Sequence, residues 1–423
     1  MTVDFDVVVI GAGPVGAATA ALLARHAQLA PARIALLAPE LAAPAARDAG
    51  ASGKAAAPEL RVSALSRASE QILRHAGAWE RLDAARLCAY ERMRVWHASQ
   101  AADGPAVLCF DAAELAEPNL GTIAGNRALA LASLAAFEAA GGAVLADRVA
   151  GMSSASDCVT LQCGAAPVTT RLVIGADGAH SQVREWLGIG VSAHDYRQSA
   201  IVATVATARA HQRTAWQRFL ASGPLALLPL FDGSCSIVWS AEQALADELM
   251  SLSPEAFAAR LDEASDRVLG ATRLCSERLA LPLQRRVARA LIGPRAALLG
   301  DAAHVVHPLA GQGVNLGLLD AAALVEALAG AAAEREDPGA ARVLRGYEQA
   351  RLTHNALMSA SMSVFNEVFS RGEGVAGALA GHLLGVAGAR AVTRRWFARR
   401  ALGLSGELPQ LARAANLTRA ASW

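Results

Sequence analysis

The stretch VVVIGAGPVG, residues 7–16, decides the fold. Its four leading apolar residues have the pattern of a strand buried on both faces, and Gly11, Gly13 and Gly16 follow in G-x-G-x-x-G spacing. A helical pattern then covers residues 17–26, and a second apolar strand comes after it. Strand, glycine turn, helix and strand make a βαβ unit, so this stretch predicts a dinucleotide-binding fold rather than a simple packing turn.

Each glycine has a separate physical task in such a turn. The first permits the turn, the second lets the backbone approach a pyrophosphate, and the third lets helix and strand pack closely. An acid that binds the adenosine ribose is expected at the end of the second strand, RIALLA (33–38), but the chain has Ala38 there. Glu40 is a displaced candidate for that contact, and an ordinary loop carboxylate is the alternative.

Composition limits the class of protein. A chain of 423 residues has room for two or three compact units. Its formal net charge of +1 gives no general basic field, so nucleic-acid binding is not expected. Six cysteines without a C-x-x-C pair, and a start that leads into a strand without a cationic leader, favour a reduced, cytoplasmic protein. The most apolar later stretch, 375–392, contains a histidine and an arginine and is not expected to span a bilayer.

Three later segments fit the same architecture. Residues 170–188 have the pattern of another buried strand, which ends in GADG (175–178) before a helix. Residues 199–285 change to alternating apolar and polar positions, with a hairpin around 232–233, which predicts a mixed sheet inserted into the nucleotide domain. Residues 292–299 return to a buried strand.

The stretch LLGDAAHVVHPLAGQGVNLGLLDAA (298–322) places an acid beside a glycine-lined helix entrance. A strand that ends at Gly300 and Asp301 puts a carboxylate at the sheet edge where ligands of α/β folds bind, and a carboxylate accepts hydrogen bonds from ribityl or ribose hydroxyls. Three glycines leave the backbone uncovered around a helix that is predicted to start near Asn315. Because a helix N-terminus favours the negative charge of a reduced flavin, this stretch indicates a flavin nucleotide.

Four stretches together resemble the FAD-dependent aromatic hydroxylases, the group A flavoprotein monooxygenases, and in particular their ubiquinone-biosynthesis (UbiH/UbiF/UbiI-like) branch. They are VVVIGAGPVG (7–16), RVSALSRAS (61–69), VIGADGAHSQVR (173–184) and LLGDAAHVVHPLAGQGVNLGLLDA (298–321). The resemblance implies an α/β fold: a Rossmann-like FAD-binding domain of the para-hydroxybenzoate-hydroxylase type, an inserted mixed β-sheet substrate domain and a helical C-terminus. The expected boundaries are 1–88, 123–190 and 286–345 for the FAD-binding domain, 89–122 and 191–285 for the substrate domain, and 346–423 for the C-terminal helical region.

The resemblance also implies how the cofactor is held. The glycine turn contacts the FAD pyrophosphate, Arg61 and Asp177 lie around the cofactor, Asp301 binds the ribityl chain, and residues 311–315 lie along the flavin. The full set of predicted cofactor-binding residues is Gly11, Gly13, Gly16, Glu40, Arg61, Asp177, Gly178, Gly300, Asp301, Pro308, Gly311, Gln312, Gly313, Val314 and Asn315. No residue is assigned as a catalytic acid or base.

The chemistry that the resemblance implies is hydroxylation of an aromatic ring. NAD(P)H, a transient co-substrate, reduces the FAD, O2 adds to form a flavin hydroperoxide, and the ring of a lipophilic (polyprenyl)phenol in ubiquinone biosynthesis attacks the distal oxygen. Because NAD(P)H only visits, one nucleotide fold suffices. The alternatives are an FAD-dependent hydroxylase of another aromatic metabolite and a non-catalytic FAD-binding assembly protein.

Two further patterns carry weaker expectations. His304 and His307 have a spacing that could bind a metal, but no third ligand matches it and Pro308 interrupts the helix, so no metal site is expected. The segment 390–423 contains seven arginines and one glutamate, a local net charge of +6, with Trp396 among them. It fits contact with the inner face of a membrane, or equally with the protein itself or another quinone-biosynthesis protein.

Overall fold

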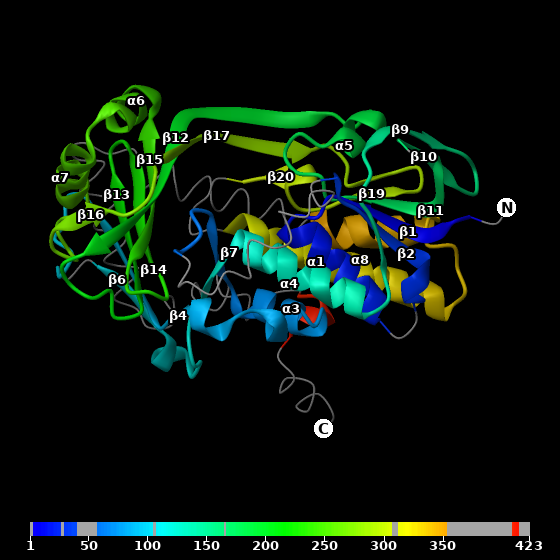
Figure 1. Ribbon diagram of the computed structural model, residues 1–423, viewed down its shortest axis with the longest axis horizontal. Helices are drawn as coiled ribbons and strands as arrows, with labels where there is room; N and C mark the ends of the chain where they lie inside the picture. Colours follow the sequence, from blue (N-terminus) through cyan, green and yellow to red (C-terminus); the bar gives the residue numbers. More distant parts are fainter. Residues whose placement is uncertain are drawn as a thin grey trace.

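The computed structural model describes residues 3–26, 29–39, 57–104, 107–164, 166–306, 312–352 and 408–413. These residues form two lobes, and the long strands β12 (Val191–Thr207) and β17 (Leu279–Ala288) run from one lobe to the other (Figure 1). The N-terminus belongs to the lobe on the right of the figure. The mixed α/β fold class predicted from the sequence is confirmed.

The first sheet forms the centre of the N-terminal lobe. Its order is β18 (Ile292–Gly293), β19 (Ala296–Leu298), β11 (Val168–Gly175), β1 (Phe5–Ile10), β2 (Ile34–Leu37) and β8 (Ala143–Leu145), and β10 (Val159–Cys163) and β9 (Val149–Ser154) extend it from β11. The pairs β11–β1, β1–β2, β2–β8 and β11–β19 are parallel. All their carboxyl ends therefore meet at one edge, where ligands bind in such sheets.

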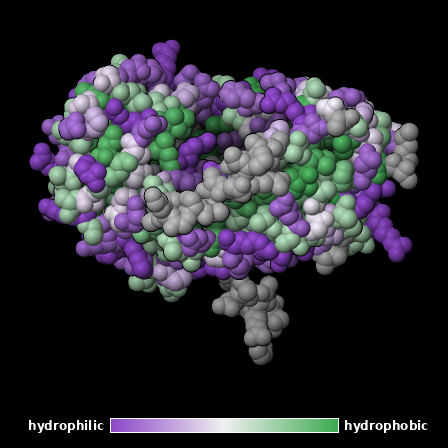
Figure 2. Space-filling model, in the orientation of Figure 1, coloured by the Kyte–Doolittle hydropathy of each residue, from purple (hydrophilic) through white to green (hydrophobic). Residues whose placement is uncertain are grey.

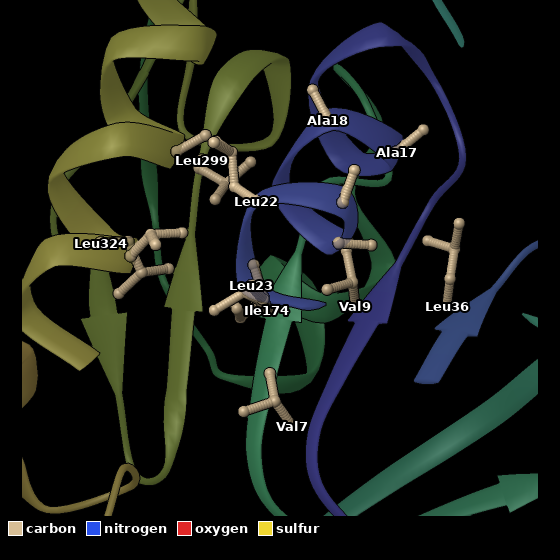
Figure 3. Close-up of a cluster of buried hydrophobic side chains, with 14 of the residues drawn as sticks. Val7, Val9, Ala17, Ala18, Leu22, Leu23, Leu36, Ile174, Leu299 and Leu324 are labelled. Atoms are coloured by element: carbon tan, nitrogen blue, oxygen red, sulfur yellow. The ribbon is translucent and has the colours of Figure 1, made fainter. Parts of the chain in front are cut away.

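Helix α1 (Pro14–Arg25) makes the crossover between β1 and β2, and most of its residues are buried in the core of this lobe. Figure 3 shows its side chains packed between the sheet and α8 (Gln312–Ala333); the labelled residues are Val7, Val9, Ala17, Ala18, Leu22, Leu23, Leu36, Ile174, Leu299 and Leu324. The helix begins at Pro14, ahead of the predicted start, because proline at the first helical position has its φ already set and lacks only an N–H that would be unpaired there.

Helix α8 also begins earlier than predicted, at Gln312 rather than near Asn315. It is long and apolar enough to span a membrane, but 72% of its apolar window is buried inside the fold. It therefore serves as a core helix, packed against α1 and α3 (Arg67–His75). A following helix, 341–352, and the short helix η8 (Gln410–Ala412) complete the described C-terminal part.

The second sheet fills the other lobe. Its order is β20 (His304–Val305), β17, β12, β15 (Cys235–Glu242), β14 (Gly223–Pro229), β13 (Thr214–Leu220), β5 (Arg92–His97) and β6 (Leu108–Asp111), with β16 (Thr272–Leu274) beside β12. The predicted hairpin is present, because β14 and β15 are antiparallel neighbours. Helices α6 (Gln243–Ser251) and α7 (Pro254–Ala264) cover one face over a separate apolar core.

A small third sheet lies between the lobes. It consists of β3 (Val62–Leu65), β7 (Gly121–Gly125) and β4 (Cys88–Tyr90), and its apolar side chains pack against β13 and β14 of the second sheet. Helix α4 (Asn126–Ala139) follows β7 and packs on α1. The remaining short helices are η1 (Pro31–Arg33), η3 (Trp79–Arg81), η4 (Ala84–Arg86), η5 (Ala112–Leu115), η6 (Gly300–Ala302) and α5 (Gln182–Trp186).

Candidate cofactor-binding site

The glycine turn, residues 11–16, connects the end of β1 to the start of α1. Gly11 has φ +107°, and a Cβ there would lie 2.5 Å from the Ala176 carbonyl oxygen; a Cβ on Gly16 would collide with the Gly11 carbonyl. Gly13 is different, because nothing lies within 4 Å of its ideal Cβ position. No side chain caps α1 and no acid lies in its first turn. The positive end of α1 therefore remains open to an anion such as a pyrophosphate.

The glycine turn and the GADG turn (175–178) line one cavity of ≈ 390 Å³. Asp177 caps α5: its Oδ2 accepts hydrogen bonds from the backbone N–H groups of Gln182 at 2.7 Å and Val183 at 3.2 Å. Its Oδ1 is buried and has no hydrogen-bond partner within the described part of the chain. An unsatisfied buried acceptor costs free energy, so a ligand that donates a hydrogen bond fits this wall of the cavity.

The acidic turn, which we define as residues 300–304, follows β19 and meets the glycine turn directly. Val15 packs against Gly300, and a Cβ on Gly317 of α8 would lie 2.6 Å from Val15 Cγ2 and 3.0 Å from Gly300 Cα. An ideal Cβ on Gly313 would lie 3.9 Å from Asp301 Oδ1. The start of α1, the acidic turn and the start of α8 therefore converge, and the Asp301 carboxylate faces the space they share.

The Asp301 side chain keeps contact with solvent, yet the protein around it changes its titration. Partial desolvation raises the pKa of the Asp301 carboxyl, while the charges of His304 and Arg61 oppose that rise. Arg61 is exposed just before β3 and acts on Asp301 through its charge. The Asp301 carboxyl oxygens are acceptors for hydroxyl groups, and their contact with the ribityl chain stays a prediction.

Arg184 joins the GADG turn to the acidic turn. Its side chain is buried, and it donates hydrogen bonds to the carbonyl oxygens of Ala302 at 2.8 Å and Ala179 at 3.1 Å. Desolvation, with the charge of Arg286, lowers the pKa of this guanidinium, and Asp177 opposes that effect. Arg184, the last residue of the motif VIGADGAHSQVR, thus attaches this motif to a segment more than one hundred residues away in the sequence.

Asn315 connects α8 to the RVSALSRAS stretch. Its Oδ1 accepts hydrogen bonds from Ser66 N–H at 2.9 Å and the Ser69 hydroxyl at 2.7 Å, and its Nδ2 donates to the Ala64 carbonyl at 2.8 Å. The side chain is buried against the β3–α3 turn. Near a flavin, Asn315 therefore acts by holding the first turn of α8 in place.

A buried charge network joins His304 of the acidic turn to Asp320 and Arg351, and the sequence predictions did not include it. Asp320 Oδ2 is 2.5 Å from His304 Nε2 and accepts a hydrogen bond from the Gly300 N–H at 3.2 Å, while Oδ1 accepts one from Arg351 Nε at 2.7 Å. Burial alone would raise the pKa of Asp320, but the charges and hydrogen bonds of His304 and Arg351 hold it well below its usual range. This network fixes the backbone that carries Asp301.

The acidic turn is also attached to the second sheet, because His304 and Val305 pair with β17 as strand β20. The lobe that carries the second sheet is thus anchored directly at the cofactor cleft. The Nε2 atom of His304 is hydrogen-bonded to Asp320. Among the described residues no three His, Cys, Asp or Glu side chains form a metal-binding group, and all six cysteines are free thiols.

Eight of the predicted cofactor residues lie close together. Gly11, Gly13, Asp177 and Gly178 line the cavity. Gly16, Gly300, Asp301 and Gly313 lie beside it, where α1, the acidic turn and α8 meet. Val314 packs against the core of the first lobe, and Gln312 opens α8. Glu40, Pro308 and Gly311 lie outside the described residues, as do His307, residues 375–392 and nearly all of the arginine-rich segment.

Known proteins are similar to this chain in sequence and in fold. A sequence profile described as FAD binding domain matches residues 154–360. The chain is 37% identical to the 3-demethoxyubiquinol 3-hydroxylase of Escherichia coli, over 86% of this chain and 90% of that protein. It is 33% identical to the mitochondrial ubiquinone biosynthesis monooxygenase COQ6 of Homo sapiens, over 86% of each chain.

Solved structures agree on the fold. The p-nitrophenol 4-monooxygenase PnpA from Pseudomonas putida superposes with a TM-score of 0.74 at 20% identity, over 96% of this chain and 100% of that one. Aklavinone-11 hydroxylase, solved with FAD and aklavinone, gives a TM-score of 0.68 at 19% identity, over 88% and 70%.

The glycine turn, the GADG turn and the acidic turn at the carboxyl edge of a mainly parallel sheet, with an attached mixed sheet, are the features of an FAD-binding oxidoreductase. An open helix N-terminus, an unsatisfied buried carboxylate oxygen and a second carboxylate facing the cleft suit the pyrophosphate and hydroxyl groups of FAD. The chain belongs to the family of FAD-dependent aromatic hydroxylases, in the branch that contains the ubiquinone-biosynthesis monooxygenases. The predicted family, monooxygenase class and FAD cofactor are thereby confirmed.

Proposed function

We propose that this enzyme hydroxylates the aromatic ring of a polyprenylphenol intermediate in ubiquinone biosynthesis. One ring C–H, one O2, one NAD(P)H and one proton are converted to one ring C–OH, one water and NAD(P)+. The observation that carries the proposal is the identity of 37% and 33% to two ubiquinone-biosynthesis hydroxylases across 86% of the chain.

When bound, FAD supplies the acceptance of a hydride and the activation of oxygen. This chain's own residues would hold it: the N-terminus of α1 and the Asp177 carboxylate would lie on its phosphate side, and Asp301 would accept hydrogen bonds from its hydroxyl-bearing chain. The first turn of α8, held by Asn315, presents backbone N–H groups that favour negative charge nearby. The second lobe, which is attached beside the acidic turn through β20, would help to exclude water from the reacting part of the cofactor.

The face of the second sheet opposite α6 and α7 supports an aromatic, lipophilic substrate. Thr204 and Ser236 are paired across β12 and β15, and Ser236 pairs with Leu228, which packs against the third sheet. Their strand neighbours point into the core under α6 and α7, so by alternation these side chains point the other way. Both hydroxyls are buried without a hydrogen-bond partner in the described chain. An uncharged wall with two spare hydroxyls suits a ring that carries oxygen substituents.

Figure 2 shows a recess between the lobes on one face, bordered by hydrophobic and hydrophilic side chains.

We place the enzyme in the cytoplasm, at the inner face of the membrane where a long isoprenoid substrate resides. The charge of +6 in the segment 390–423 supports contact with anionic lipid. Flotation of the wild-type chain and of the variant Arg394→Gln/Arg395→Gln/Arg399→Gln/Arg400→Gln with vesicles of anionic or neutral lipid tests this placement, because η8 stays in both chains. Equal flotation of both chains would reject it.

The test of the reaction uses the purified, FAD-loaded chain with NADH or NADPH, isotopically labelled O2 and paired phenols with and without an isoprenoid chain. We expect the prenylated phenol to accelerate NAD(P)H oxidation and to gain one labelled oxygen atom. Hydroxylation of the unprenylated phenol alone would indicate another aromatic metabolite as substrate. FAD binding without any oxygen consumption would indicate an assembly protein.

A deletion strain complements this assay. The quinone precursor that accumulates in the strain identifies the ring position that the enzyme hydroxylates. Accumulation of none, with normal ubiquinone, would reject a role in this pathway.

A further inference from the structure

The cavity beside the glycine turn lacks an acid at the position where dinucleotide folds bind the adenosine ribose. That acid follows the second strand of the βαβ unit, where its carboxylate accepts hydrogen bonds from the ribose hydroxyls. Here the residue after β2 is Ala38, which is completely buried and offers no acceptor. Pro39, the next residue, lines the cavity but has no polar side chain. The ribose contact must therefore come from elsewhere.

The neighbouring strand supplies a carboxylate at the same edge. Leu37 of β2 is paired with Leu145 of β8, and the Ala38 N–H donates a hydrogen bond to the Leu145 carbonyl at 3.0 Å. Because the strands run parallel, the residue two positions after Leu145 lies in the row of Pro39. That residue is Asp147, and it lines the same cavity as the glycine turn and Asp177.

The orientation of Asp147 is fixed by the backbone around it. Its Oδ1 accepts hydrogen bonds from the N–H groups of Arg148 at 2.7 Å and Gly164 at 3.2 Å. A carboxylate can accept about four hydrogen bonds, so one such group can serve backbone N–H groups and ligand hydroxyl groups together. Asp147 is half-buried, which protects such hydrogen bonds from competition with bulk water.

We propose that Asp147 binds the ribose hydroxyls of the adenosine half of FAD and replaces the acid that is absent from position 38. The inference rests on FAD as the cofactor and not on the identity of the aromatic substrate. It makes Asp147 a residue for selecting FAD over FMN, which lacks the adenosine half. The competing explanation is that Asp147 only holds the turn between β8 and β9.

The test compares binding of FAD, FMN and ADP to the apoprotein, by flavin fluorescence and calorimetry, in the variants Asp147→Asn and Asp147→Ala. Asn keeps an oxygen for the N–H groups of Arg148 and Gly164, so the turn is retained. We expect FAD and ADP to bind roughly 10- to 100-fold more weakly in both variants, as for the loss of hydrogen bonds to a charged group, with FMN binding unchanged within about twofold.

Two controls separate the outcomes. Asp103→Asn, an exposed loop carboxylate outside the cleft, is expected to leave all three affinities unchanged. Glu40→Gln tests the other acid near the end of β2. Equal weakening of FAD and FMN would assign Asp147 to the turn alone, and weakening of FAD by Glu40→Gln without any effect of Asp147→Asn would overturn the proposal. Neither result would change the outcome of the hydroxylation assay, because that assay uses the wild-type protein.

Discussion

The cofactor cleft has two walls that differ in how they are built. The glycine turn presents backbone atoms to the cleft, whereas the acidic turn is held in place by buried charged side chains. In the glycine turn, function comes from missing side chains, because Gly11 and Gly16 allow contacts that a Cβ would block and Gly13 leaves open space. In the acidic turn, function comes from a network in which Asp320 binds Gly300, His304 and Arg351. Both walls prepare the cleft before the cofactor arrives, and they should fail in different ways.

Breaking the charge network should have the largest effect. Asp320→Ala leaves the His304 ring and the Arg351 guanidinium buried without their common carboxylate. Loss of one partner of a buried ion pair destabilises proteins by roughly 3–5 kcal/mol, so we expect a loss of that size in the unfolding free energy of the apoprotein, measured with urea. A loss no larger than the ~0.5 kcal/mol of a surface substitution would show that the network does not contribute to the free energy of unfolding.

The same carboxylate gives the wall a pH dependence. The pKa of Asp320 is lowered in the folded protein, so its stabilising contribution is complete above the ordinary value of 3.8 and is lost as pH falls towards the lowered value. Asp320→Asn cannot titrate. The stabilities of wild type and Asp320→Asn should therefore approach each other as the solution is acidified, in the range where other probes still report folded protein, and a constant difference would argue against a charged Asp320.

The glycine turn should break by overpacking. In Gly11→Ala the new Cβ would lie 2.5 Å from the Ala176 carbonyl oxygen, at a φ of +107° that alanine rarely adopts. Overpacking of this kind costs about 1–3 kcal/mol, and we expect the unfolding free energy to fall by that amount. FAD affinity should fall as well, because the turn must shift away from the GADG turn. Unchanged stability would mean that the two turns do not meet as described.

Gly13→Ala is the matched control in the same turn. Its Cβ meets nothing within 4 Å, so the protein should tolerate it with a stability loss of about 0.5 kcal/mol at this helix N-cap. The methyl group nonetheless enters the space beside the open end of α1, and FAD binding should weaken by roughly tenfold. Equilibrium binding followed by flavin fluorescence checks this. Normal FAD affinity would place the pyrophosphate elsewhere.

The contrast between the walls explains what the sequence could predict. Glycine spacing is local, so VVVIGAGPVG reveals the βαβ unit and the turn from neighbouring residues alone. Asp320 contacts residues 16 and 31 positions away, and Arg184 contacts a carbonyl 118 positions away, so these pairs depend on the tertiary fold. One signal was available: Asp320 is one of two acids, with Glu326, inside a largely apolar helix, and buried charges require partners. Asp147 gave no signal without the strand order.

Asp301 gives the smallest change in stability and the sharpest separation of the two roles of the acidic turn. Desolvation raises its pKa, so its stabilising contribution is present below the ordinary value of 3.8 and is lost as pH rises through the raised value. Once it is ionised, Asp301 therefore slightly destabilises the apoprotein. Asp301→Asn should leave the apoprotein as stable as wild type or slightly more stable. The difference should stay within about 0.5 kcal/mol, because solvent reaches the carboxylate, and it should vanish in acid.

FAD should nevertheless bind to Asp301→Asn roughly 10- to 100-fold more weakly, since Asn accepts fewer hydrogen bonds from hydroxyl groups and carries no charge. A large loss of apoprotein stability would instead make Asp301 part of the scaffold that Asp320 maintains, and the acidic turn would then have one role rather than two.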